Sequence, residues 1–228
     1  MLDKAFETLK TYDWGQDRNL LNPIDEAIVA THGDDAKRKE LEDKLAAVLK
    51  TDVTYDAKQF VCRKLMVIGT ASSVPTLAEL LADEKLSHMA RYALERIPCE
   101  EANKALLDAM GKTEGELKVG MISSLGVRSD AASVAPLAAL LGDSDSSVAG
   151  AAAVALGVIG SSEAGKALAD AKPSAIVSDA SLACAESLLA DGKKLEALTT
   201  YKRILKSKPP KHVKVAATRG MLACAKKK

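Results

Sequence analysis

The chain has 228 residues, of which 47% are apolar and 28% are charged, the proportions of a globular protein. Only 3% are aromatic, so Ala, Leu, Val and Ile must fill the core, which favours packed helices over a β-sandwich or barrel. No stretch approaches the roughly 20 consecutive apolar residues that span a bilayer, and we expect no membrane span. The first residues lack the apolar segment behind a basic start that is typical of an export signal, which leaves the compartment open.

The first 50 residues have the pattern of short amphipathic helices that lie outside the repeat found further along the chain. Gly33 can end one of these helices in the left-handed conformation, and Asp34 can cap the next. We therefore expect residues 1–52 to form an N-terminal helical cap. The predicted helices cover residues 2–11, 20–31 and 35–50.

Trp14 is the only tryptophan and follows the first predicted helix. We expect its ring to fold back over the open end of the first hairpin, because a terminal repeat must shield a core that has no further neighbour. The alternative is an exposed binding anchor beside Tyr12 and Arg18, since tryptophan and arginine are common at the centre of interfaces.

A repeat of about 30 residues starts near residue 53. Leucine recurs at intervals of 29, 31 and 31 residues, and a second leucine follows each of these anchors 12 residues later. A fifth unit continues the spacing with Ala185 and Ala197. The four anchor pairs are Leu65 and Leu77, Leu94 and Leu106, Leu125 and Leu137, and Leu156 and Leu168.

Each repeat unit is predicted to be two amphipathic helices joined by a short turn, because its apolar residues recur every three or four positions. Pro75 and Pro136 lie near the start of the second helix, where a missing N–H costs little. Asp56 and Gln59 have the spacing of a capping box at the start of the first unit.

A hairpin of this length cannot bury both faces alone, so neighbouring hairpins must complete its core. The sequence therefore predicts an all-α fold, an α-solenoid of stacked helical hairpins that forms one domain over residues 1–228. No segment alternates with the period of a strand, and no sheet is expected. The repeats cover residues 53–175, and residues 176–228 form the C-terminal end.

Residues 55–175 resemble HEAT-like repeats of the short kind first associated with phycobilisome lyases. The clearest match is Val148, Ala152 and the segment from Ala155 to Gly160, although Ala149 stands where the family usually has arginine. The resemblance implies the solenoid fold and an interaction scaffold. Bilin lyase activity has only the family name in its favour.

The fifth unit is similar to a tetratricopeptide repeat, with Gly192, Ala197, Tyr201 and Pro209 at that family's spacings. Ser181 stands where the family has its tryptophan, so the similarity is partial. As a whole, the chain resembles the HEAT-repeat segments of large bacterial proteins, which are often exported and are generally taken to be scaffolds.

No pattern in the sequence predicts chemistry. The four cysteines lie 37, 85 and 40 residues apart, too far for a zinc or redox motif, and each is expected to be a buried thiol. The three histidines are also dispersed, and there is no phosphate-binding glycine loop. We therefore expect no catalytic residue, no metal and no cofactor. The residues concerned are Cys62, Cys99, Cys184, Cys224, His32, His88 and His212.

Charge is unevenly distributed. Residues 193–228 carry 12 basic and 1 acidic side chain, whereas residues 1–56 and 57–192 each have a net charge of −5. The basic end is either a docking patch for an acidic partner or a solvated cap with a frayed tail at 226–228. The patch would comprise Lys202, Arg203, Lys206, Lys211 and Lys214.

The leading functional hypothesis is a non-catalytic protein-interaction scaffold, monomeric, that docks a partner protein or a neighbouring domain of its parent chain. Its docking surface would be the curved face lined by the second helices. The alternative is a nucleic-acid-binding solenoid, in the extreme a DNA glycosylase-like enzyme, that uses the basic C-terminal end, although the acidic middle repeats disfavour it. The side chains expected on the docking face are Glu79, Lys104, Asp108, Lys166 and Asp170.

Overall fold

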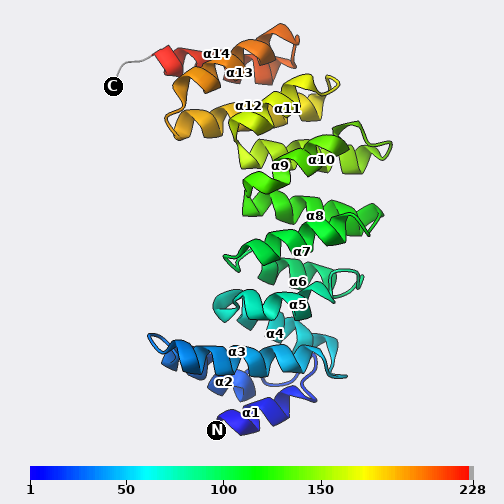
Figure 1. The fold of residues 1–228 in the computed structure, drawn as a ribbon, viewed down its shortest axis with the longest axis vertical. Helices are drawn as coiled ribbons and strands as arrows, with labels where there is room; N and C mark the ends of the chain where they lie inside the picture. Colours follow the sequence, from blue (N-terminus) through cyan, green and yellow to red (C-terminus); the bar gives the residue numbers. More distant parts are fainter. Residues whose placement is uncertain (226–228) are drawn as a thin grey trace. The chain divides into compact units, whose positions relative to one another are not determined.

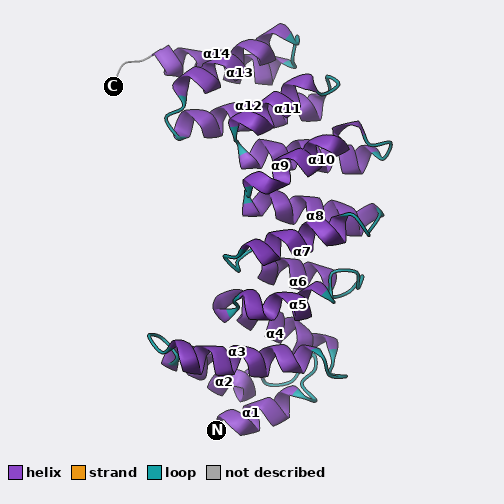
Figure 2. Ribbon diagram, viewed as in Figure 1, coloured by secondary structure: helices purple, strands orange, loops and turns teal. Residues whose placement is uncertain are grey.

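A computed structural model describes residues 1–225. Over these residues the chain consists of α-helices and short 3-10 turns joined by loops, with no strand (Figure 2). The all-α solenoid prediction is confirmed. No helix in residues 1–225 combines the length and the apolar content that a membrane crossing requires. The chain divides into two compact units, Met1–Thr113 (unit 1) and Glu114–Lys228 (unit 2).

Unit 1 contains an N-terminal group of three helices followed by two hairpins, α4–α5 and α6–α7 (Figure 1). The 3-10 turn η1 precedes α2, and the 3-10 turn η2 joins α4 to α5. Within each hairpin, the helix that comes first along the chain is called the first helix and the other the second helix. The elements are α1 (Leu2–Leu9), η1 (Arg18–Leu21), α2 (Asn22–Ala30), α3 (Asp35–Leu49), α4 (Tyr55–Ile68), η2 (Ala71–Ser73), α5 (Val74–Ala78), α6 (Ser87–Leu94) and α7 (Glu100–Met110).

Unit 2 contains three hairpins, α8–α9, α10–α11 and α12–α13, and ends in α14. Its first helices follow one another in space, because α10 packs against both α8 and α12. The elements are α8 (Gly115–Arg128), η3 (Ala131–Ser133), α9 (Val134–Ala139), η4 (Leu140–Gly142), α10 (Ser146–Ile159), α11 (Ser162–Asp170), α12 (Ala175–Ala190), α13 (Lys194–Lys206) and α14 (Lys211–Ala225).

The leucine spacing marks equivalent places in the hairpins. Every anchor leucine lies on a first helix, and every leucine 12 residues later lies on a second helix. All eight side chains are at most 2% exposed. Ala185 on α12 and Ala197 on α13 are fully buried as well, so the fifth hairpin keeps the same spacing with smaller side chains. The repeat in the sequence is therefore a repeat in the core.

The predicted start of α3 is confirmed, because the Asp34 side chain caps this helix by accepting a hydrogen bond from the Lys37 N–H. Gly33 has the left-handed φ of +81°, but α2 ends earlier than predicted, at Ala30 with Thr31 as its C-cap. The capping box at Asp56 and Gln59 is wrong. The cap of α4 is Thr54, whose hydroxyl accepts the Ala57 N–H at 3.1 Å, because the helix begins one residue before Asp56.

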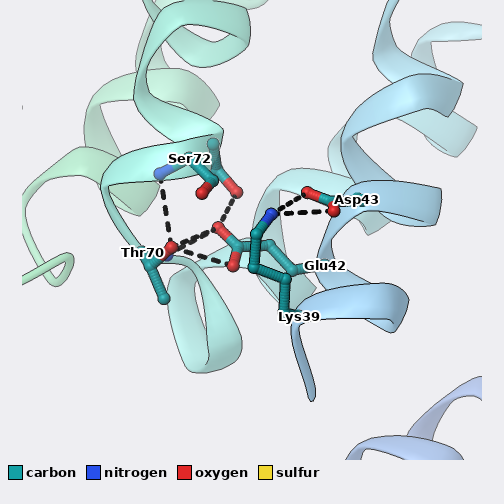
Figure 3. A network of polar contacts seen from close by, with 6 residues as sticks. Lys39, Glu42, Asp43, Thr70 and Ser72 are labelled. Carbon is teal, nitrogen blue, oxygen red and sulfur yellow. Dashed lines mark hydrogen bonds and ion pairs between the residues drawn. The ribbon is translucent and has the colours of Figure 1, made fainter. Parts of the chain in front are cut away.

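A buried carboxylate joins α3 to the first hairpin of unit 1 (Figure 3). Glu42 is fully buried and accepts hydrogen bonds from the Thr70 N–H at 2.7 Å and from the Thr70 hydroxyl. The buried Ser73 hydroxyl donates a third hydrogen bond to it. Since a buried charge is tolerated only when it is well hydrogen-bonded, these donors explain how a glutamate can lie in the core. The sequence analysis missed this contact.

Glycine allows the first helices of unit 2 to approach closely. A Cβ added to Gly126 on α8 would lie 2.9 Å from the Ala155 Cα on α10. A Cβ added to Gly157 on α10 would lie 2.8 Å from the Ala180 carbonyl oxygen on α12. The leucine–glycine pairs in these repeats are therefore required by helix packing.

Candidate functional site

The second helices of unit 1 enclose a groove with a volume of about 380 Å³. One wall comes from η2, α5 and the turn after α5, and the other comes from α7. Because α5 and α7 pack against each other, short side chains on both leave a hollow between the helices instead of filling it. The apolar lining consists of Ala71, Val74, Pro75, Ala78, Leu81, Ala82, Ala105 and Ala109.

The rim of this α5–α7 groove is charged and mixed in sign. The predicted residues Lys104 and Asp108 are exposed, lie one turn apart on α7, and both line the groove. Glu101 and Lys112 extend the same rim. Glu79, which was predicted with them, is exposed just beyond α5 and does not line the groove. An apolar floor with a charged rim is the composition of a protein interface.

A smaller groove of about 210 Å³ lies beside the second helices of unit 2, between α11 and α13. It brings together Lys166 on α11 and Arg203 on α13, which the sequence analysis had placed in two different candidate sets. Glu196 lines the same groove and accepts a hydrogen bond from the Ser162 hydroxyl. Asp170 is exposed at the end of α11, outside this groove.

The remaining basic candidates lie on the outside of the last two helices. Lys202 and Lys206 are exposed on α13, and Lys211 and Lys214 are exposed in the first turn of α14. Nearby, His212 lies 3.1 Å from Asp179 on α12. That these side chains form one docking patch stays a prediction, and the tail at 226–228 lies outside the described residues.

Trp14 is not a cap. Its side chain is 89% exposed, so the prediction that it covers the end of the first hairpin is wrong. The reason is a tight turn from Asp13 to Gln16, closed by a backbone hydrogen bond of 3.2 Å, which directs residue 14 away from the core. Leu9, at the end of α1, is fully buried, and α1 packs against η1 and α2.

The four thiols are free. The buried-thiol prediction is correct for Cys62 and Cys184, where burial raises the pKa to about 12 and about 11, so both stay protonated near neutral pH. It is wrong for Cys99 and Cys224, which are half-buried because they lie at or near helix ends. Within residues 1–225, no three His, Cys, Asp or Glu side chains gather closely enough to hold a metal ion.

Comparison with known families matches residues 103–189 to a family described as HEAT repeats. The match covers the segment in which the leucine anchors are followed by glycine. It does not extend to the fifth unit's last helices, where the tetratricopeptide-like similarity stays a prediction. A comparison with curated proteins finds no match.

Proposed function

Because the chain is a HEAT-repeat protein, we propose that it is a non-catalytic scaffold that docks a partner protein, or a neighbouring domain of its parent chain, on its second helices. HEAT repeats commonly mediate protein interactions, and the family is generally non-catalytic. One observation carries the proposal: the α5–α7 groove combines an apolar floor with exposed Lys104 and Asp108 on its rim.

The groove has the chemistry to receive apolar side chains of a partner. Its floor offers Pro75, Ala78 and Ala105, which are short enough to let a partner's Leu or Phe reach between the helices. Burying one such side chain contributes about 1.5–3 kcal/mol, so a few of them supply most of a moderate affinity. The mixed charges on the rim then select orientation, because like charges placed opposite each other are costly.

Photo-crosslinking tests this proposal. A photoreactive phenylalanine analogue replaces Ala105 in the groove and, as a matched control, the 54%-exposed Val67 on the first helix α4. We expect a discrete crosslinked protein from the Ala105 position that is missing from the Val67 position. The purified partner must then bind the unmodified chain. Adducts from both positions, or from Val67 alone, would contradict a docking site on the second helices.

Nucleic-acid binding is the second candidate, and the observation in its favour is that Lys166 and Arg203 line one groove of unit 2. Glu196 in the same groove weakens the case, since phosphate contacts need clustered cations without a facing carboxylate. Fluorescence polarisation with a labelled single-stranded oligonucleotide of about 20 nucleotides tests it. We expect weak binding at low salt that is lost near physiological ionic strength. Binding that persists there and falls with Arg203→Glu would favour this second function.

A further inference from the structure

The loop before α2 presents the chain's single tryptophan on a defined turn. The Gln16 N–H donates to the Asp13 carbonyl at 3.2 Å, and Gly15 has a φ of +84°, as the third position of a type II turn requires. Trp14 occupies the second position of this turn, at its projecting corner. The backbone therefore holds an 89%-exposed indole away from the core.

This loop is fastened to the start of α4. The hydroxyl of Thr54, which also caps α4, donates to the Tyr12 carbonyl, and the Gln16 side chain donates to the Thr11 carbonyl at 3.2 Å. The two acidic residues of the loop are engaged locally, because Asp13 accepts the Trp14 N–H and Asp17 accepts the Asn19 N–H. A fastened loop loses little conformational freedom when a ligand binds, which favours affinity.

The loop and α4 together enclose a pocket of about 450 Å³. Its aromatic lining comes from Tyr12, Trp14 and Phe60, and its cationic lining comes from Arg18, Arg63 and Lys64. Asp56 is the one carboxylate among the lining residues. All of these side chains belong to unit 1.

Two of the three cations are held in place. Asp25, on α2, accepts from Arg18 at 2.6 Å and from Lys64 at 2.5 Å. Both cations also lie over the Phe60 ring, at 4.5 Å and 4.8 Å from its centroid, within the range of a cation–π contact. Phe60 and Asp25 therefore fix the positions of Arg18 and Lys64 before any ligand arrives.

The third cation is available. Arg63 is exposed on α4, and in the described part of the chain it forms no ion pair. Counting Arg18, Arg63 and Lys64 against Asp56 and Asp25 leaves one net positive charge around the pocket. One positive charge of the pocket is thus unbalanced, and most of the Trp14 indole, which lines the pocket, is exposed to water.

We propose that this pocket is a second docking site, separate from the α5–α7 groove, for a short acidic segment of a partner protein. The segment presents one Asp or Glu side chain next to a large apolar side chain. Its carboxylate binds Arg63, and its apolar side chain packs on Trp14. A bidentate arginine–carboxylate contact and a buried tryptophan are the groups that usually dominate the free energy of such interfaces.

A long polyanion does not suit this pocket. Residues 1–113 contain 16 basic and 20 acidic side chains, so unit 1 as a whole repels an extended phosphate backbone. Only the local surplus at Arg63 is attractive, and it matches a single carboxylate. The charge distribution therefore favours a peptide over a nucleic acid here.

The single tryptophan makes the proposal directly measurable. A displayed library of random eight-residue peptides without tryptophan is selected on the whole chain, and enriched peptides are titrated while the Trp14 emission is recorded. We expect enriched peptides to place Asp or Glu within one or two positions of an aromatic or large aliphatic residue. Their binding should shift the emission, because the indole leaves water.

Variants decide where the peptides bind, with labelled peptides and polarisation as the readout. Trp14→Ala and Arg63→Glu should each weaken binding by at least about tenfold. The matched controls Leu195→Ala, which removes another exposed apolar side chain, and Arg96→Glu, which reverses another exposed arginine, should stay within about twofold. Ala105→Arg in the α5–α7 groove should also leave peptide binding unchanged. The proposal for the Trp14 pocket can therefore be refuted without refuting the proposal for the α5–α7 groove.

Three outcomes would overturn the proposal. The first is a selection that enriches no peptide, or enriches basic ones. The second is a set of acidic peptides that bind Trp14→Ala as well as the unmodified chain. The third is a thymidine oligonucleotide of about 20 nucleotides that shifts the Trp14 emission at physiological salt, which would assign the pocket to nucleic acid instead.

Discussion

Units 1 and 2 build the same hairpin but hold their first helices together in different ways. In unit 2 the residue after the anchor leucine is Gly126 or Gly157, and backbone atoms of the next helix occupy the space of the missing side chain. In unit 1 the same positions hold Met66 and Glu95, both half-buried. The shared spacing of the leucines therefore does not fix how closely successive hairpins approach.

Unit 1 also has a polar contact that stabilises its first hairpin. Glu42 on α3 gathers Thr70 and Ser73 at the turn before α5, whereas the turn before α9 in unit 2 begins with Asp130, which accepts the Ala132 N–H from within the same turn. In both units the first side chain of the turn thus accepts a backbone N–H from within the turn, since Thr70 also accepts the Ser72 N–H. In unit 1 the Glu42 carboxylate of the neighbouring helix α3 adds hydrogen bonds to this turn.

The largest effect should be common to both units. Leu65→Ala in unit 1 and Leu125→Ala in unit 2 each remove a fully buried anchor, and each should lower the free energy of unfolding by about 2–5 kcal/mol. Chemical denaturation followed by circular dichroism measures both. A loss below about 1 kcal/mol for either variant would show that the two anchors are not equivalent.

In unit 2, replacing a glycine by alanine should lower stability only where a neighbouring helix packs closely against that glycine. Gly157→Ala places a Cβ 2.8 Å from the Ala180 carbonyl oxygen, so α10 or α12 must shift, and we expect a loss of about 1–3 kcal/mol. On the same helix, Gly150→Ala meets only the end of the Ile176 side chain at 3.3 Å. This control should be neutral, or stabilising by up to about 1 kcal/mol through helix propensity. Equal effects of the two substitutions in thermal melts would refute the close packing of α12 against Gly157.

Glu42→Ala in unit 1 should lower the free energy of unfolding by about 1–3 kcal/mol, because it leaves the buried Ser73 hydroxyl and the Thr70 N–H without their acceptor. The adjacent Asp43→Ala is the control, because Asp43 forms an exposed ion pair with Lys39 that contributes little. Hydrogen exchange should show faster exchange in residues 70–78 for Glu42→Ala alone. Unchanged exchange there would mean that the contact does not hold the turn.

The smallest expected effect is a change in the free energy of unfolding as the pH falls. Burial opposes ionisation of Asp25, but hydrogen bonds from Lys64 and Arg18 outweigh it and hold the pKa of this carboxyl below its ordinary value. A lowered pKa stabilises the fold above the unfolded chain's pKa, and this stabilisation is lost as the pH falls through the folded value. The advantage of the unmodified chain over Asp25→Asn, less than about 1 kcal/mol because the pair is partly exposed, should therefore vanish on acidification. A difference between the unmodified chain and Asp25→Asn that stays constant as the pH falls would exclude this linkage.

The leucine spacing predicted the fold because buried positions on stacked hairpins must recur. Helical periodicity alone placed Lys104 and Asp108 on one face of α7, and their role in docking stays a prediction. Periodicity could not reveal the apolar floor of the groove, which depends on the approach of α5 to α7. Glu42 was hidden because α3 is rich in charges that pair along its surface, such as Lys39 with Asp43. Trp14 was misplaced because one backbone hydrogen bond in a turn decides its direction.

The proposal that a partner docks in the α5–α7 groove is tested most directly by measuring the affinity of the crosslinked partner for two variants of the purified chain. Ala105→Arg places a long charged side chain in the α5–α7 groove, and Val67→Arg places the same side chain on the exposed face of α4. With both variants shown to melt like the unmodified chain, we predict a Kd at least about tenfold higher for Ala105→Arg and within about twofold for Val67→Arg. An unchanged Kd for Ala105→Arg would contradict docking on the second helices.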